Sequence, residues 1–157
     1  MKIIKVLALD QATKICGYCL MDSKNDAIIT AGTLQVTGEY IQEKISNLKQ
    51  QIISLIDKYQ PDYFILEDIQ YQSNPKVYKT LAELLGVLEN YYYETQKPYR
   101  VVPSSTWRTR YLGIKGVRLE AKKATMDYVQ KKYNICVDND TADAIGLAEY
   151  GCHLLNK

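Results

Sequence analysis

Three segments with the composition of β-strands stand in a row before the first helical pattern. Residues 3–9, IIKVLAL, form a short apolar run, and ICGYCLMD at 15–22 and AIITAGTLQV at 27–36 follow it after short polar stretches such as SKND. Apolar runs of this length, bounded by turn-forming residues, are typical of strands. Because the connections are short, we expect the three strands to form an antiparallel meander.

Helical and strand patterns alternate after this meander. Apolar residues recur every three or four positions from Glu39 to Tyr59, which predicts an amphipathic helix that ends before Pro61. The other predicted elements are a strand in DYFILED (62–68), a helix from about Lys76 to Glu94, a strand in YRVVP (99–103), a short helix starting at Ser104 or Ser105, and helices at 118–133 and 139–155.

This order of elements, β-β-β-α-β-α-β-α-α, predicts an α/β fold with a mixed five-stranded sheet and helices on both faces. The sequence contains no internal repeat, low-complexity tract or linker that would divide it. At 157 residues it has the length of one domain. We therefore expect residues 1–157 to form a single domain.

Composition favours a soluble protein of the cytoplasm. Hydrophobic residues make up 46% of the chain and charged residues 24%, and no apolar run approaches the roughly 20 residues that a membrane span needs. The opening MKIIKVLALD reaches an aspartate at position 10 and lacks the apolar core and cleavage site of a signal peptide. We expect no membrane association and no export.

Four cysteines raise the question of a zinc site. Cys16 and Cys19 form a C-x-x-C pair, to which Cys136, Cys152 and His153 would add ligands. Cys16 and Cys19 lie in a predicted strand, however, where residues three apart point to opposite faces. We therefore expect free, mostly buried thiols, with structural zinc as the alternative.

Positive charge is concentrated in one part of the chain. Residues 97–132 contain ten basic residues and two acids and so carry +8, whereas the other residues, with ten basic groups and sixteen acids, carry −6. Such segregation favours the docking of a polyanion on one region, and a solvated helical face is the alternative.

Four acids lie where a buried charge is costly. Asp10 ends the first apolar run, Glu67 ends the fourth strand, and Asp140 and Asp143 stand three apart on one face of the last helix. Each alone has a structural explanation, such as a turn cap or a favourable acid at a helix N-terminus. If the first and fourth strands are neighbours, however, all four acids meet.

Clustered carboxylates among apolar residues need protonation or a cation. Leu9, Leu66 and Ile145 adjoin these acids, and no histidine or thiolate belongs to the set. Hard oxygen ligands of this kind favour Mg²⁺ or Mn²⁺ over zinc.

With these residues assembled, the chain resembles the RuvC family of Holliday junction resolvases, in the ribonuclease H-like superfamily, along nearly its whole length. LALDQATKICGY resembles the family's opening strand, whose aspartate is followed seven residues later by glycine, here Asp10 and Gly17. FILEDIQYQSNPKVYKTLAELLGVLE looks like the fourth strand with its glutamate, Glu67, and the helix that follows. DNDTADAIGLAEYG is similar to the closing helix, with its two acids at Asp140 and Asp143.

The chain departs from the family pattern at two places. Gln11 and Ala12 replace the usual Pro-Gly, and the aromatic residue expected three positions after the glutamate falls on Gln70, with Tyr71 beside it. These differences, the short length and the richness in Lys, Ile, Asn and Tyr resemble the phage-encoded branch, whose members accept a wider range of branched DNA. A phage protein of this kind would act in the host cytoplasm.

The resemblance implies a metal-dependent endonuclease that cleaves Holliday junctions and other branched DNA, such as three-way junctions and forks. It implies 5′-phosphate and 3′-hydroxyl products and two Mg²⁺ or Mn²⁺ ions in each site. The implied ligands are Asp10 as the bridging residue, Glu67, Asp140 and Asp143. The resemblance also implies a homodimer formed through the helix at 76–94.

Basic and aromatic residues supply the expected DNA contacts. Lys122 or Lys123, near the family's basic position, would neutralise charge at the phosphate, or contact backbone phosphates without a catalytic role. Tyr91, Tyr92 and Tyr93 would stack bases or, as we expect, pack in a core or interface. The candidate DNA-binding residues are Gln70, Tyr71, Arg108, Arg110, Lys115, Arg118, Lys122 and Lys123.

Two other functions remain open. LDQATKICGY also resembles the first phosphate loop of actin-like ATPases and sugar kinases, although those proteins need two such domains. A branched-DNA binding protein that no longer cuts is the second alternative, but such a binder gains nothing from clustered negative charge.

Overall fold

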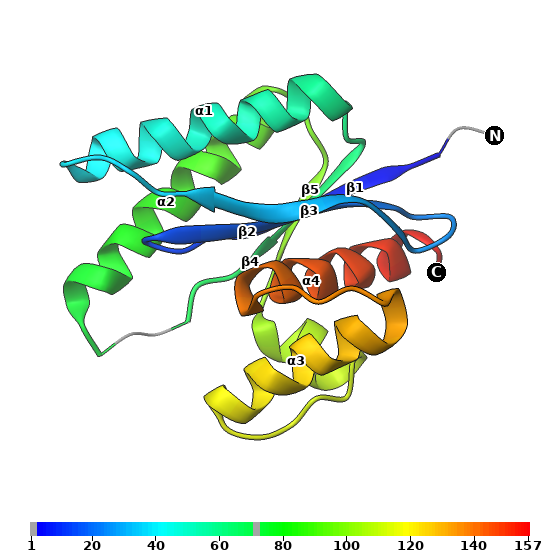
Figure 1. The fold of residues 1–157 in the computed structure, drawn as a ribbon. Helices are drawn as coiled ribbons and strands as arrows, with labels where there is room; N and C mark the ends of the chain where they lie inside the picture. Colours follow the sequence, from blue (N-terminus) through cyan, green and yellow to red (C-terminus); the bar gives the residue numbers. More distant parts are fainter. Residues whose placement is uncertain (1–2, 71–72) are drawn as a thin grey trace.

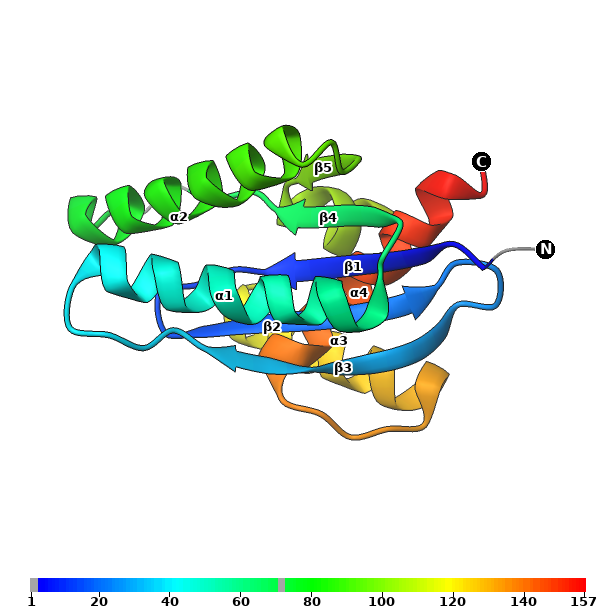
Figure 2. The same cartoon turned by 90° about the horizontal axis from the view of Figure 1, so that it is seen from above.

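A mixed five-stranded sheet forms the centre of the computed structural model, which describes residues 3–70 and 73–157. The strands are β1 (Lys5–Asp10), β2 (Ile15–Asp22), β3 (Ala27–Gln35), β4 (Tyr63–Glu67) and β5 (Tyr99–Val102). Figure 2 shows their order across the sheet, β3-β2-β1-β4-β5. β1, β2 and β3 form the predicted antiparallel meander, whereas β4 pairs parallel to β1 and β5 parallel to β4.

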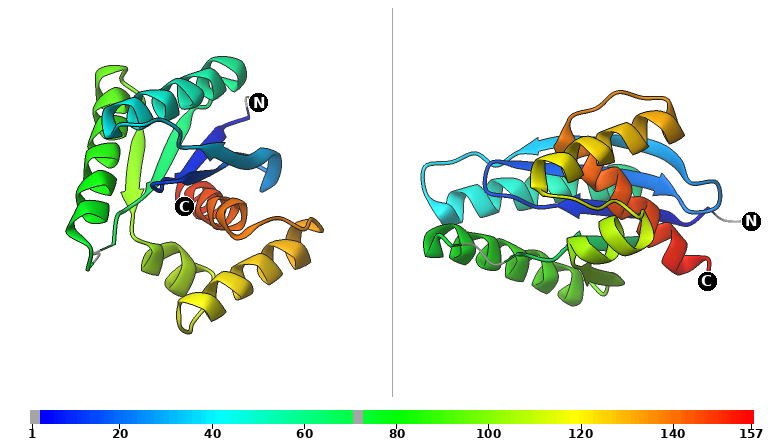
Figure 3. Two further views of the ribbon diagram at one scale, coloured as in Figure 1. Left: turned by 60° about the vertical axis from the view of Figure 1, so that its left-hand side comes forward. Right: turned by 90° about the horizontal axis from the view of Figure 1, so that it is seen from below.

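Helices cover both faces of this sheet, as predicted. They are α1 (Ile41–Tyr59), α2 (Pro75–Glu94), the π-helix η1 (Ser105–Tyr111), α3 (Arg118–Tyr133) and α4 (Asn139–Leu155). α1 and α2 lie on one face and α4 on the other, with α3 and η1 on the side of α4 (Figure 1 and Figure 3). Within the described ranges, no helix combines the length and apolar character needed to cross a bilayer.

Each face of the sheet has its own hydrophobic core because side chains alternate along a strand. Leu7 and Leu9 of β1 face α1 and α2, whereas Val6 and Ala8 face α4. All four are at most 1% exposed. A strand that is buried on both faces has apolar side chains at nearly every position, which explains the apolar run at residues 3–9.

The helix ends follow local signals. Asn74 caps α2 by accepting from the backbone N–H of Lys76, and Pro75 occupies the first helical position. α1 ends at Tyr59, and the next residue, Gln60, has a left-handed backbone and directly precedes Pro61. α1 begins at Ile41, two residues after the predicted start, which is within the usual uncertainty of a helix end.

Close packing of α4 on the sheet brings its N-terminal end near the carboxyl end of β1. Residues 141–149 of α4 are all buried. Gly17 of β2 pairs with Asp10 in the sheet, and a Cβ built on Gly17 would lie 2.1 Å from the backbone oxygen of Asp140. Because Gly17, seven residues after Asp10, has no side chain, the backbone of Asp140 at the start of α4 can pack directly against β2.

The cysteines are free thiols, as predicted. Cys16 packs in the core beneath α1 and α2, and Cys19 in the core beneath α4. The C-x-x-C pair thus points to opposite faces of the sheet and cannot bind one zinc ion. Cys152 is buried as well, whereas Cys136 is exposed.

Candidate active site

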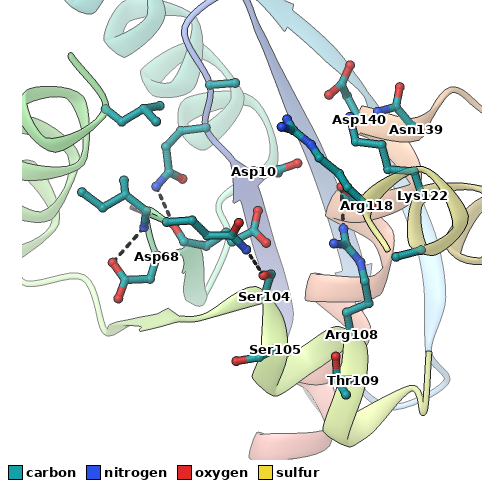
Figure 4. A pocket seen from close by; sticks show the side chains of 18 of the residues that line it. Asp10, Asp68, Ser104, Ser105, Arg108, Thr109, Arg118, Lys122, Asn139 and Asp140 are labelled. Carbon is teal, nitrogen blue, oxygen red and sulfur yellow. Dashed lines mark hydrogen bonds and ion pairs between the residues drawn. The ribbon is translucent and has the colours of Figure 1, made fainter. Parts of the chain in front are cut away.

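The carboxyl ends of β1 and β4 form the edge on which the site is built. These strands are parallel and adjacent, with Leu9 opposite Leu66, so Asp10 and Glu67 follow at neighbouring positions. The N-terminal turns of α4 bring Asp140 and Asp143 to the same place. All four predicted acids line one pocket of about 530 Å³, which Figure 4 shows from close by.

Polar and basic residues from five segments complete the pocket. They include Gln11 after β1, Gln70 after β4, Ser104, Ser105, Arg108 and Thr109 at η1, Arg118 and Lys122 on α3, and Asn139 at the start of α4. Residues far apart in the sequence therefore meet around the acids.

Burial and mutual repulsion raise the pKa values of the acids. Asp10 titrates well above its ordinary pKa because of burial, repulsion from Glu67 and a hydrogen bond to Glu67. Burial raises the pKa of Asp143 to about 6, and the charge of Arg108 limits that rise. The pKa of Asp140 is raised by burial and by Asp138, and Lys122 opposes this shift. A cation would relieve this repulsion.

Two side chains that the sequence did not identify hold Glu67. The indole Nε1–H of Trp107 donates to Oε1 of Glu67 at 3.1 Å, and the side-chain amide of Gln11 donates to the backbone carbonyl of Glu67. Trp107, the single tryptophan of the chain, is fully buried. A buried indole needs a hydrogen-bond acceptor, and this is the one signal that would have drawn attention to SSTWRTRY.

Arg108 pairs with one of the four acids. Its Nη2 lies 2.7 Å from Oδ2 of Asp143, and its guanidinium lies 4.5 Å from the centre of the Trp107 ring. In Figure 4 the side chain rises from η1 into the pocket. The sequence predicted a contact to a DNA phosphate at this position and did not predict this ion pair.

The other predicted basic residues divide into two groups. Arg118 and Lys122 line the pocket, and Lys122 is half-buried. Lys123, Arg110 and Lys115 are exposed and lie outside the residues that line it. The structure therefore brings Lys122 to the acids and leaves Lys123 on the surface.

The predicted base-contacting residues Gln70 and Tyr71 follow β4. Gln70 is exposed and lines the pocket, and its side-chain amide donates to the hydroxyl of Ser104. Tyr71 lies outside the described residues.

The three consecutive tyrosines of α2 have three different environments. Tyr92 is fully buried and its ring centre lies 4.6 Å from that of Phe64, so it is a core residue. Tyr91 is half-buried at the edge of the same core, and Tyr93 is 76% exposed. The expectation of core packing is met by Tyr92.

The donor set of the pocket fits a hard divalent cation. Four carboxylates supply oxygen atoms only, and Oδ1 of Asp143 is buried without a hydrogen-bond partner among residues 3–70 and 73–157. As the side chains lie, no three acids, cysteines or histidines among residues 3–70 and 73–157 are grouped closely enough to hold an ion. The four carboxylates line one pocket, but holding a cation jointly would require their side chains to rearrange.

Comparisons with known proteins agree with this arrangement. The profile of the family described as crossover junction endodeoxyribonuclease RuvC matches residues 6–149. The RuvC of Helicobacter pylori strain G27 is 31% identical over 87 residues, which cover 54% of this chain and 55% of that protein. The RuvC of Dictyoglomus thermophilum is 24% identical over 145 residues, covering 90% and 92% of the two chains. The match thus spans about half the length of the Helicobacter relative.

The fold has a close counterpart among solved structures. T. thermophilus RuvC, solved in complex with a Holliday junction substrate, superimposes with a TM-score of 0.79 over 98% of this chain and 96% of that one. The sequences are 11% identical, so this likeness concerns the fold. Since the family profile covers most of the chain, from β1 to the middle of α4, this protein belongs to the RuvC family of crossover junction endodeoxyribonucleases.

Proposed function

We propose that this protein is a divalent-metal-dependent endonuclease that cleaves Holliday junctions and other branched DNA. One observation carries the proposal: Asp10, Glu67, Asp140 and Asp143, from three separate elements, line a single pocket together with Arg108, Arg118 and Lys122. Membership of the RuvC family supports the same reaction. The preference among four-way junctions, three-way junctions and forks stays a prediction, as does a phage origin.

The four carboxylates are the proposed ligands of Mg²⁺ or Mn²⁺. When bound, two such ions supply Lewis-acid activation of the phosphate and lower the pKa of a bound water. Asp10 is the proposed bridging ligand because it lies at the end of the central strand β1, between Glu67 of the neighbouring β4 and the acids of α4.

The residues of the chain that surround the acids orient the DNA and neutralise its charge. Lys122 and Arg118, on the first turns of α3, line the pocket with the acids and are proposed to contact the scissile phosphate. Trp107 and Gln11 hold Glu67 in place through its carboxylate and its backbone carbonyl. The proposed products are 5′-phosphate and 3′-hydroxyl ends, which result when water attacks the phosphorus and the 3′-oxygen leaves.

The proposed assembly is a homodimer in the cytoplasm. A two-fold axis would present two pockets to the two strands of a symmetric junction, which fits paired cuts. Arg110, Lys115 and Lys123, exposed outside the pocket, are proposed to contact DNA backbone away from the cleavage site.

The test is cleavage of a labelled four-way junction, three-way junction, replication-fork mimic and linear duplex, with Mg²⁺ or with EDTA. Wild type is compared with Asp10→Asn and with the matched control Asp68→Asn. Asp68 adjoins Glu67 and lines the pocket, but its Oδ1 accepts from the backbone N–H of Ile69, a local role that asparagine can keep.

Metal-dependent cuts in branched substrates, abolished by Asp10→Asn with DNA binding retained and preserved in Asp68→Asn, are the expected result. If no divalent ion supports cleavage and Asp10→Asn binds junctions as wild type does, the protein is a branched-DNA binding protein and the nuclease proposal is wrong.

A further inference from the structure

The ion pair between Arg108 and Asp143 occupies a position that the proposed function assigns to a metal ion. Nη2 of Arg108 and Oδ2 of Asp143 are 2.7 Å apart, and the two side chains are only 16% and 9% exposed. This is a charge-assisted hydrogen bond in a largely water-excluded place. Of the four acids in the pocket, Asp143 is the one for which the described residues show a salt bridge.

Each residue of this ion pair has a buried polar atom that makes no hydrogen bond to the described residues. Nε of Arg108 and Oδ1 of Asp143 are buried and have no hydrogen-bond partner in the described structure. A permanent structural ion pair is normally satisfied on all its buried atoms, because each unpaired buried atom costs free energy. The pair is therefore incomplete, in the way expected of a site that is also used by another ligand.

The environment of Arg108 holds it in position. Its guanidinium lies 4.5 Å from the centre of the Trp107 ring, in the range of a cation–π interaction. Trp107 in turn donates to Glu67. Two consecutive residues of η1 thus each contact one acid: Trp107 contacts Glu67 of β4, and Arg108 contacts Asp143 of α4. π-helical turns are frequent at functional sites.

A carboxylate paired with a guanidinium cannot also accept a divalent cation without bringing two positive charges together. Oδ1 of Asp143 has no partner among the described residues, but a cation there would lie next to the Arg108 guanidinium, and cation binding through Oδ2 requires the Nη2–Oδ2 contact to be broken. In the absence of a metal, loss of Arg108 would leave Asp143 buried beside Glu67, whose charge already raises the pKa of Asp143.

We infer that Arg108 is the counter-ion of Asp143: it holds this carboxylate in the metal-free protein, and it is displaced when a divalent cation binds. This inference rests on the proposed function. Arg108 is accordingly a positioning residue that makes the protein stable without metal and weakens its affinity for metal.

The experiment measures binding of Mg²⁺ alone, by calorimetry in the absence of DNA, and thermal unfolding with Mg²⁺ or EDTA. Wild type is compared with Arg108→Gln and with the matched control Arg110→Gln. Arg110 belongs to the same π-helix but is exposed and does not line the pocket. Arg108→Lys keeps a positive charge and is expected to lie between wild type and Arg108→Gln.

We expect Arg108→Gln to bind Mg²⁺ at least about tenfold more tightly than wild type, because no charge-assisted hydrogen bond has to be broken first. In EDTA its Tm should fall by about 4–8 °C, and Mg²⁺ should restore most of the loss. Arg110→Gln should match wild type in both measurements. If Arg108→Gln does not fold in EDTA, the inference requires that Mg²⁺ restores its folding.

The failures are distinguishable. If wild type binds Mg²⁺ and Arg108→Gln binds it equally or more weakly, or stays unfolded in Mg²⁺, the counter-ion role is wrong while the nuclease proposal stands. If neither wild type nor Arg108→Gln binds Mg²⁺ or Mn²⁺, the counter-ion role is wrong, and the cleavage assay described above decides the nuclease proposal separately.

Discussion

The indole N–H of Trp107 donates a 3.1 Å hydrogen bond to Oε1 of Glu67, although the two residues stand 40 positions apart. The ring is held from the other side by α4, where a Cβ at Gly146 would lie 2.6 Å from it. The orientation of a proposed metal ligand thus depends on packing between η1 and α4. Side chains that orient ligands in this way affect metal affinity and activity strongly.

Replacing Trp107 with phenylalanine removes this donor and keeps most of the ring. We expect Trp107→Phe to reduce junction cleavage and Mg²⁺ affinity by about 10-fold to 100-fold. The free energy of unfolding should fall by about 1–2 kcal/mol. Cleavage rates, calorimetry and urea unfolding measure the three quantities.

Tyr111→Phe is the control for this change. Tyr111 is on the same π-helix but packs against Tyr150 and His153, with ring centres 5.4 Å and 4.8 Å away, and does not line the pocket. Its cleavage should stay within about threefold of wild type. Equal effects of the two substitutions would show that the hydrogen bond to Glu67 has no role in orienting the ligand.

Adding one methyl group at Gly17 should displace the start of α4. The nearest atoms to a Cβ there are the backbone oxygen and carbon of Asp140, at 2.1 Å and 2.7 Å, and backbone cannot move aside as a flexible side chain can. We expect Gly17→Ala to destabilise the protein by about 1–3 kcal/mol and to reduce cleavage more than Gly86→Ala does.

Gly86→Ala is the control. Gly86 lies on the exposed face of α2, and a Cβ there would have no atom of a neighbouring described residue within 4 Å, so this variant should be neutral or stabilised by about 0.5–1 kcal/mol. Wild-type cleavage by a folded Gly17→Ala protein would contradict the prediction.

Lys122 and Lys123 should differ sharply in their effect on cleavage. Lys122 lines the pocket and opposes the rise in the pKa values of Asp140 and Asp143, whereas Lys123 is exposed outside it. We expect Lys122→Ala to reduce the cleavage rate by about 100-fold or more. Lys123→Ala should change the rate less than about threefold and act on the salt dependence of DNA binding. Single-turnover cleavage and binding at two salt concentrations separate these effects. A larger loss of cleavage in Lys123→Ala than in Lys122→Ala would contradict the prediction that Lys122 acts at the phosphate.

A buried carboxylate outside the pocket should make stability depend on pH. Glu149 is 1% exposed and accepts from Lys132 at 2.6 Å, Tyr133 at 2.6 Å and Tyr128 at 2.7 Å. Burial alone would raise its pKa, but these hydrogen bonds outweigh burial and lower the pKa below the ordinary 4.5. A lowered folded-state pKa gives stability that is complete above the unfolded-state value and is lost as pH falls through the folded-state value.

We therefore expect the contribution of Glu149 to disappear progressively below about pH 4.5, and Glu149→Gln to remove that part of the acid sensitivity. At neutral pH this variant should lose about 2–3 kcal/mol of unfolding free energy. Asp26→Asn is the control, because Asp26 faces the same Lys132 at 3.9 Å with both side chains 39% exposed, a pair worth less than about 1 kcal/mol. Urea unfolding from pH 3 to 7 tests both, and parallel pH profiles for wild type and Glu149→Gln would contradict the assignment.

Most of the fold follows from patterns that the sequence displays directly. The strands alternate or run apolar because they are buried, and helix boundaries at 118–133 and 139–155 agree with the structure to the residue. The sequence places Asp10 and Glu67 at the ends of two apolar runs, whereas the parallel neighbourhood of these two strands is given by the sheet. The three-residue spacing of Asp140 and Asp143 at the start of an apolar helix likewise indicates that they share a face.

The part of the site that could not be predicted depends on the π-helix and on contacts between distant residues. A periodicity of 3.6 residues does not describe η1, so it gave no means of placing Trp107 against Glu67 or Arg108 against Asp143. Counting charge also does not separate the basic residues: within the stretch at 97–132, Arg108, Arg118 and Lys122 line the pocket, whereas Lys132 pairs with Glu149. Charge totals say nothing about the direction of each side chain.

The burial of the cysteines makes the natural protein suitable for site-specific labelling. All four cysteines lie among the described residues, with Cys16, Cys19 and Cys152 buried and Cys136 exposed between α3 and α4. Burial also raises the pKa values of those three thiols, which further suppresses their reaction with maleimides. A fluorophore would thus attach to the folded chain at one position outside the pocket, without any substitution.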